Sequence, residues 1–121
     1  MNAAARSSVA YIAARLADKR NASSIYDYDR GTYVSITGTV TDSNVNVYDF
    51  DRGCFITGHG NNGAYTLYDY GNSAHINLKI SQGGTFSGYD YDSGSFFNGT
   101  VRGRNVSLYD YDDGGYHNYT V

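Results

Sequence analysis

Aspartate and aromatic residues alternate in five short blocks of this sequence, and these blocks hold the side chains whose types and spacing could do chemistry. Each block reads Tyr-Asp-Tyr or Tyr-Asp-Phe, and four of the five continue with a second aspartate, whereas Gly71 takes that place in the third. Paired carboxylates near a glycine could hold calcium, which binds six to eight oxygen atoms. The candidate pairs are Asp27/Asp29, Asp49/Asp51, Asp90/Asp92 and Asp110/Asp112.

Turn formation is the competing interpretation of these aspartates. An Asp-x-Gly segment suits a tight turn, because the carboxylate accepts a following backbone N–H and the glycine adopts a left-handed conformation. A complete calcium loop supplies further acids, and the last block alone adds one, Asp113. We therefore expect turn-forming aspartates and no cofactor, with divalent-cation binding, Ca²⁺ in particular, as the alternative.

The aromatic residues on either side of each central aspartate are the candidate binding residues. Rows of tyrosine beside carboxylates can stack on sugar rings, hold organic cations or cover a protein partner. The same rings could instead stabilise a sheet through cross-strand contacts worth up to about 1 kcal/mol each. The residues concerned are Tyr26, Tyr28, Tyr48, Phe50, Tyr68, Tyr70, Tyr89, Tyr91, Tyr109 and Tyr111.

Other reactive side chains are scattered along the chain. His59, His75 and His117 do not share one position within the blocks, and Cys54 is the single cysteine. A zinc site needs three or four converging ligands, and no serine lies in a nucleophile-elbow motif. We therefore predict a protein that is not an enzyme and has no catalytic residues.

The blocks recur at a nearly constant interval, which indicates structural repeats. Their first tyrosines are 22, 20, 21 and 20 residues apart. In the second repeat, residues 44–50 and 54–59 are predicted strands, joined by a turn over residues 51–53. Turn signals about every ten residues, with no helical pattern between them, exclude alternating strands and helices.

Alternation along the strands predicts which side chains face the core. Val45 and Val47 are expected inside and Tyr48 and Phe50 outside, which also turns Asp49 inward. A buried, unpaired carboxylate would cost several kcal/mol. Either the aspartate lies at a corner and accepts turn N–H groups, or a bulge before the tyrosine reverses the faces.

Residues 3–20 are predicted to form an amphipathic helix. Ala5, Val9, Ile12 and Leu16 recur at helical spacing and give one apolar stripe. We expect this helix to cap one end of a stack of repeats, because such a stack must cover its terminal core. Docking on a partner or on a membrane surface is the alternative.

These features together predict a single domain over residues 1–121, with the helix followed by five repeats over residues 24–121. The expected fold is an all-β solenoid of the parallel β-helix type, with five coils of about 21 residues. A solenoid of stacked antiparallel hairpins is the alternative.

The charge of the chain and the sequences near its two ends bear on its expected partners and location. The net charge is −3, and the part after residue 20 is strongly acidic, so we predict neither nucleic-acid binding nor, without a long apolar run, membrane insertion. Cytoplasmic residence is expected because no export signal is apparent. The last strand, ending at residues 119–121, predicts a homo-oligomer through its free edge. The predicted function is a structural or protein-interaction module, and the alternative is a module that binds carbohydrate or divalent cations.

Overall fold

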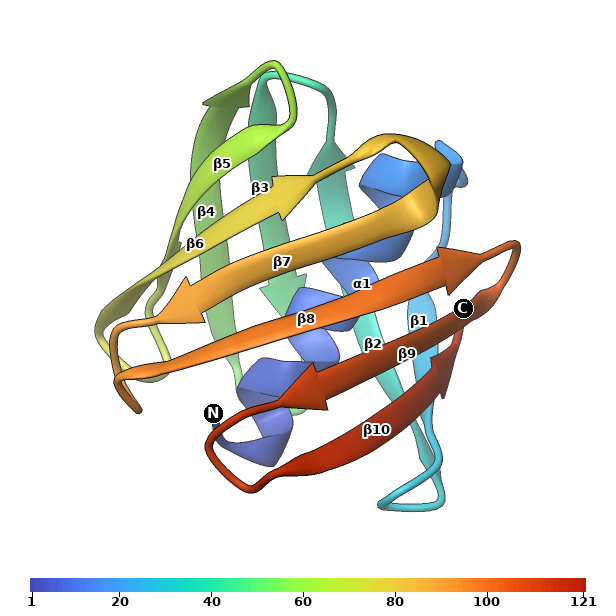
Figure 1. The fold of residues 1–121 in the computed structure, drawn as a ribbon, viewed down its shortest axis with the longest axis vertical. Coiled ribbons are helices and arrows are strands. Elements are labelled where there is room, and N and C mark those ends of the chain that lie inside the picture. Colours follow the sequence, from blue (N-terminus) through green and yellow to red (C-terminus); the bar gives the residue numbers. More distant parts are fainter.

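Ten antiparallel strands close into a barrel around a single α-helix (Figure 1). The structure is a computed structural model that describes all 121 residues. Each strand pairs with its neighbours in sequence, and the last strand pairs with the first. The elements are α1 (Ala3–Asp18), β1 (Ser24–Asp27), β2 (Thr32–Val40), β3 (Asn44–Asp49), β4 (Cys54–Asn61), β5 (Ala64–Asp69), β6 (Ala74–Ile80), a short 3-10 helix (Gln82–Gly84), β7 (Thr85–Asp90), β8 (Ser95–Arg102), β9 (Asn105–Asp110) and β10 (Gly115–Thr120).

Alternating side chains give each strand an inner and an outer face, as predicted. Val45 and Val47 of β3 are buried, and Tyr48 lies on the outer face. In β7 and β8 the inner face also contains glycines: Phe86 lies opposite Gly99, and Phe97 opposite Gly88. A Cβ on Gly99 would lie 2.5 Å from the Phe86 ring. Each phenylalanine therefore occupies the space that a side chain on the opposing strand would need.

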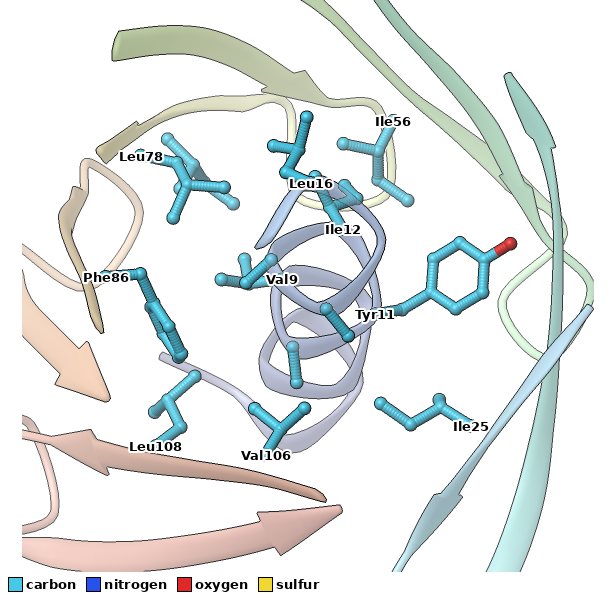
Figure 2. Close-up of a cluster of buried hydrophobic side chains, with 14 of the residues drawn as sticks. Val9, Tyr11, Ile12, Leu16, Ile25, Ile56, Leu78, Phe86, Val106 and Leu108 are labelled. Carbon is cyan, nitrogen blue, oxygen red and sulfur yellow. The ribbon is translucent and has the colours of Figure 1, made fainter. Parts of the chain in front are cut away.

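The helix α1 fills the interior of the barrel. Its buried residues cover every side of the helix, from Ala5 to Leu16. It contacts β1, β2, β6, β8 and β9, and Figure 2 shows strand side chains surrounding it. A ten-stranded barrel is too wide for its own inward side chains to fill, and a helix rich in alanine and serine supplies the missing core without crowding the wall.

The solenoid prediction is therefore wrong, and so is the tandem-repeat stacking that it assumed. Each repeat is one antiparallel hairpin step around a closed barrel, and no parallel coils form. The alternative of stacked antiparallel hairpins is also wrong, because such a stack stays open whereas these strands close. Closure satisfies the backbone groups that an open stack leaves unpaired at its edges. The helix prediction was correct in position, but α1 lies inside the barrel rather than capping a stack.

The seam between β1 and β10 is the shortest ladder of the barrel. It contains two residue pairs, Tyr26 with Thr120 and Asp27 with Tyr119, whereas the other ladders contain four to six. Because β10 pairs on both sides, the free edge assumed for self-association does not exist. Self-association stays a prediction, but it would need another surface.

The single α-helix, α1, does not combine the length and the apolar character that crossing a membrane requires.

Candidate functional site

The turns that follow β1, β3, β5, β7 and β9 share one construction. The aspartate that ends each strand accepts, through Oδ1, the backbone N–H two residues later at 2.9–3.1 Å. Four residues after that aspartate the backbone is left-handed, at a glycine in four turns and at Ser73 in the third. Of the two interpretations that the sequence left open, the corner is confirmed. The aspartates are Asp27, Asp49, Asp69, Asp90 and Asp110.

These five aspartates form a carboxylate ring at one end of the barrel, and each is at most 1% exposed. Arginines from the turns supply countercharge. The Arg30 Nε lies 2.7 Å from Oδ2 of Asp27, and Arg52 bridges two ring members, at 2.9 Å from Asp49 and 2.9 Å from Asp69. Buried carboxylates are tolerated when charged partners and N–H groups satisfy them in this way.

The N-terminal turns of α1 complete the ring from inside. The Arg6 Nη1 donates to Asp110 at 3.1 Å, and the Met1 α-amino group lies 3.3 Å from the same carboxylate. Ser8 Oγ donates to Asp49 at 3.1 Å. Burial lowers the pKa of Arg6, but Asp110 and Tyr119 outweigh this and hold it above its ordinary value. The positive end of the helix dipole also points at the ring, so charge fixes the direction in which α1 enters the barrel.

The predicted metal pairs are separated by this arrangement. In each pair the first aspartate belongs to the ring, whereas the second lies exposed on the turn: Asp29, Asp51, Asp92 and Asp112. Turn N–H groups bond every ring carboxylate, and arginines bond four of the five. Asp90 instead accepts from Ser93 Oγ and lies 4.0 Å from the Met1 amino group. These contacts give no support to calcium there, and cation binding stays a prediction.

One group of possible ligands does converge, beside the seam. Asp110, Asp113 and His117 place one ligand atom each within 4.8 Å of one another. His117 bonds Asp113 at 2.8 Å and also bonds Asp29 of the β1–β2 turn, which ties β10 to β1. Desolvation raises the pKa of Asp113, but the Gly115 N–H and His117 outweigh this effect and hold that pKa below its ordinary value. Arg6 Nη1 lies 3.1 Å and 3.6 Å from the two carboxylates and supplies the positive charge between them.

The candidate binding residues lie on the outer wall, above the ring. The first tyrosine of each block lies between two other rings, and we call it the central tyrosine. It makes edge-to-face contacts with the aromatic residue two positions later and with the ring seven positions later, at centroid distances of 4.7–4.9 Å. We call the five trios together the aromatic belt. They are Tyr26/Tyr28/Tyr33, Tyr48/Phe50/Phe55, Tyr68/Tyr70/His75, Tyr89/Tyr91/Phe96 and Tyr109/Tyr111/Tyr116.

The belt divides the predicted binding residues into two kinds. The first tyrosine of each block is half-buried within its trio. The second aromatic residue is 56–59% exposed in every block. Edge-to-face pairs are worth about 0.5–1.5 kcal/mol beyond burial, so the central tyrosines stabilise the belt while the outer rings remain open to a partner.

Two uncharged hollows lie beside the belt. The first, of about 570 Å³, is lined by Tyr89, Phe96 and Tyr111 together with Asn77, Ser87 and Asn98. The second, of about 450 Å³, is lined by Tyr28 with Thr100, Asn105, Ser107 and Asn118. Aromatic walls with a few polar groups are typical of small-molecule sites.

Sequence reasoning missed three parts of this site. Asp69 was omitted because the third block lacks its second aspartate, although its position in the block matches the other ring members. The third ring of each trio always lies seven residues after the central tyrosine, a spacing that the sequence does contain. The role of Arg6 could not be read from the chain, because it depends on the helix lying inside the barrel.

Comparison of the chain with protein-family models, with curated proteins and with solved structures found no match in any of the three.

Proposed function

We propose that this protein is a non-enzymatic binding module that recognises neutral carbohydrate through the aromatic belt. The observation that carries the proposal is the composition of its exposed apolar surface. All nine exposed large apolar side chains are aromatic, and all nine belong to the belt. Aromatic rings stack on the C–H faces of sugars and retain a polar edge when the ring is tyrosine.

The polar groups next to the belt favour an uncharged ligand. Neither of the two hollows has a charged residue in its lining. Amide and hydroxyl side chains there can both donate and accept hydrogen bonds, as sugar hydroxyls do. On its other border the belt meets the exposed second aspartates of the turns, which disfavour anionic polymers.

Protein interaction, including self-association, is the second candidate and uses the same surface. Exposed aromatic residues are enriched at protein interfaces, and the belt exposes nine of them on one end of the barrel. A protein interface would engage the belt as a continuous surface. A sugar ligand would engage individual rings next to polar groups. Cytoplasmic residence, expected from the sequence, stays a prediction.

Affinity electrophoresis in gels containing neutral polysaccharides tests the proposal. We expect retardation by at least one of cellulose derivatives, xylan, mannan and mixed-linkage glucan, and none by heparin or pectin. Replacing two belt residues, Tyr91→Ala with Tyr111→Ala, should remove the retardation. Thr39→Ala, an exposed outer position away from the belt, is the matched control and should behave like the wild type.

A protein that migrates identically in every gel, while light scattering reports a dimer that the double variant dissolves, would replace the carbohydrate proposal with self-association through the belt.

A further inference from the structure

We infer that the outer wall from β5 to β10 is a groove for a linear oligosaccharide of neutral sugars, lying across the strands with Tyr111 and Tyr28 as its two stacking platforms. This inference rests on the proposed function and deepens it, because it names one part of the belt and one form of ligand.

Three hollows follow one another along this half of the wall. A hollow of about 300 Å³ over β5, β6 and β7, which Lys79 also lines, shares Asn77 and Gly88 with the 570 Å³ hollow. The 570 Å³ hollow lies next to the 450 Å³ hollow along β8. Asn98 lines the first of these two and Thr100 lines the second, and residues two apart on one strand face the same side about 7 Å from each other. The hollows therefore form a row rather than separate pits.

The two platform rings are held in position before any ligand arrives. The Tyr111 hydroxyl accepts a hydrogen bond from Asn98 Nδ2 at 3.0 Å, and the Tyr28 hydroxyl bonds Thr120 Oγ1 at 3.1 Å. Each ring also packs edge-to-face on the central tyrosine of its trio. Rings fixed in this way lose little rotational freedom on binding, which reduces the entropic cost of association.

Amide side chains lie opposite two of the central tyrosines in this half of the wall. The residue paired across the ladder with a central tyrosine is Asn77 for Tyr89 and Asn98 for Tyr109. At the equivalent position the other repeats carry threonine: Thr37, Thr57 and Thr120. An asparagine offers two donors and a carbonyl acceptor, whereas threonine offers one hydroxyl. Both asparagines line the 570 Å³ hollow, so amide groups suited to sugar hydroxyls lie beside its aromatic rings.

The spacing of the platforms favours a chain over a single sugar. Tyr111 follows β9 and its hydroxyl reaches β8, and Tyr28 follows β1 and its hydroxyl reaches β10. The two contacted strands are two steps apart around the barrel, which corresponds to about 10 Å. A single sugar is too small to lie on both rings, so a ligand must contain several linked sugars to reach both platforms.

Calorimetric titration with a length series tests the inference. The probes are cello-, xylo- and manno-oligosaccharides from disaccharide to hexasaccharide. We expect an affinity gain of about tenfold or more when the chain becomes long enough to engage both platforms, because the second contact is then intramolecular. Tyr111→Ala and Tyr28→Ala should each remove that gain, leaving the hexasaccharide to bind about as weakly as the disaccharide.

The matched control is Thr39→Ala. Thr39 is exposed on β2, outside both the belt and the row of hollows. Its replacement should leave the length series unchanged. Circular dichroism on each variant confirms that the barrel remains folded, since all three positions are exposed.

The outcomes separate this inference from the proposed function. Equal affinity for short and long chains, or an unchanged length series in both Tyr111→Ala and Tyr28→Ala, would overturn the groove while leaving carbohydrate binding by the belt in place. Failure of every oligosaccharide, together with unretarded migration in every polysaccharide gel, would overturn both.

Discussion

The two ends of the barrel are built in different ways. At the carboxylate end, five turns repeat one design, with a buried aspartate and left-handed backbone four residues later. At the opposite end each of the four turns differs. In the first, the Thr41 hydroxyl accepts the Asn44 N–H, and in the second Asn62 and Gly63 are both left-handed. The third contains the 3-10 helix Gln82–Gly84, and the fourth has one left-handed residue, Gly103. The repeat is therefore preserved only where the helix, the arginines and the turns must meet in one charged layer.

Electrostatics contributes to the stability of the fold mainly at the carboxylate end. Ring carboxylates are buried with their partners, and breaking such a pair leaves an uncompensated buried charge. At the opposite end the ion pair between Lys19 and Asp42 is exposed on both sides. Exposed pairs are screened by water and salt, and contribute little. The comparison predicts large effects at the first end and small effects at the second.

Removing one ring carboxylate should have the largest effect. Asp49→Ala deletes the acceptor of Arg52 Nε, of Ser8 Oγ and of two turn N–H groups. We expect a loss of about 3–5 kcal/mol in the free energy of unfolding, measured by urea denaturation. Asp49→Asn keeps an oxygen for the turn but loses the charge. It should lower the free energy of unfolding by less than Asp49→Ala does, but still measurably.

Asp42→Ala is the control at the opposite end and should leave the urea midpoint unchanged. If Asp49→Asn were as stable as the wild type, the aspartates would act only as turn formers and the electrostatic contrast between the ends would be lost.

Alkaline pH should destabilise the protein through its buried tyrosines. Burial, reinforced by the charge of Asp27, raises the pKa of Tyr119 far above its ordinary value of 10.0, and burial also raises the pKa of Tyr11. A raised pKa in the folded state means that stability is complete below pH 10 and falls as the pH rises above it. One such tyrosine changes the free energy of unfolding by up to about 1.4 kcal/mol per pH unit.

Tyrosinate absorbance measured alongside circular dichroism checks this prediction. Tyr119 should ionise only with unfolding, so the last part of the tyrosinate signal should appear together with the loss of the circular dichroism signal. Tyr119→Phe, near the carboxylate ring, should raise the pH midpoint of unfolding more than Tyr11→Phe. The reverse order would show that the charged layer does not govern alkaline stability.

The third turn offers the smallest test. Ser73 adopts φ +53 where the four equivalent turns have glycine, and a left-handed conformation is unfavourable for a residue with a Cβ. Ser73→Gly should therefore raise the free energy of unfolding by about 0.5–1 kcal/mol. Gly94→Ser makes the reverse change in another turn and should lower the free energy of unfolding by a similar amount. Thermal melting of both variants measures the pair, and equal melting points would show that the turns differ in more than this one residue.

Local features of this fold were accessible from the sequence. The helix, the alternation of inner and outer residues, and the corner position of the aspartates all depend on interactions within about ten residues. Val45 and Val47 are core residues for the reason predicted, and Tyr48 and Phe50 lie on the outer wall.

Closure of the barrel was not accessible, because the same hairpin pattern suits an open stack and a ring. The pairing of Tyr26 with Thr120 distinguishes the closed barrel from an open stack. This is a contact between distant parts of the chain, which a local pattern does not predict. The helix was misplaced for a related reason: a stripe through Ala5, Val9 and Leu16 describes one apolar face, but the alanines and serines on the other faces are equally suited to burial when a wall surrounds them. The hollows could not be predicted either, because they form where outer side chains of different repeats meet, and that arrangement depends on the barrel.

The short seam has a consequence for how the chain reaches its native state. A helix enclosed by a wall cannot enter after the wall has closed, so α1 must dock on a partly formed sheet while β1 and β10 are still apart. Hairpins between neighbouring strands form within microseconds, whereas joining residues 26 and 120 requires closing a loop that spans most of the chain. We therefore expect seam formation to be the last step of folding, and we expect the amide hydrogens of its two-pair ladder to exchange with solvent before those of any other strand pair.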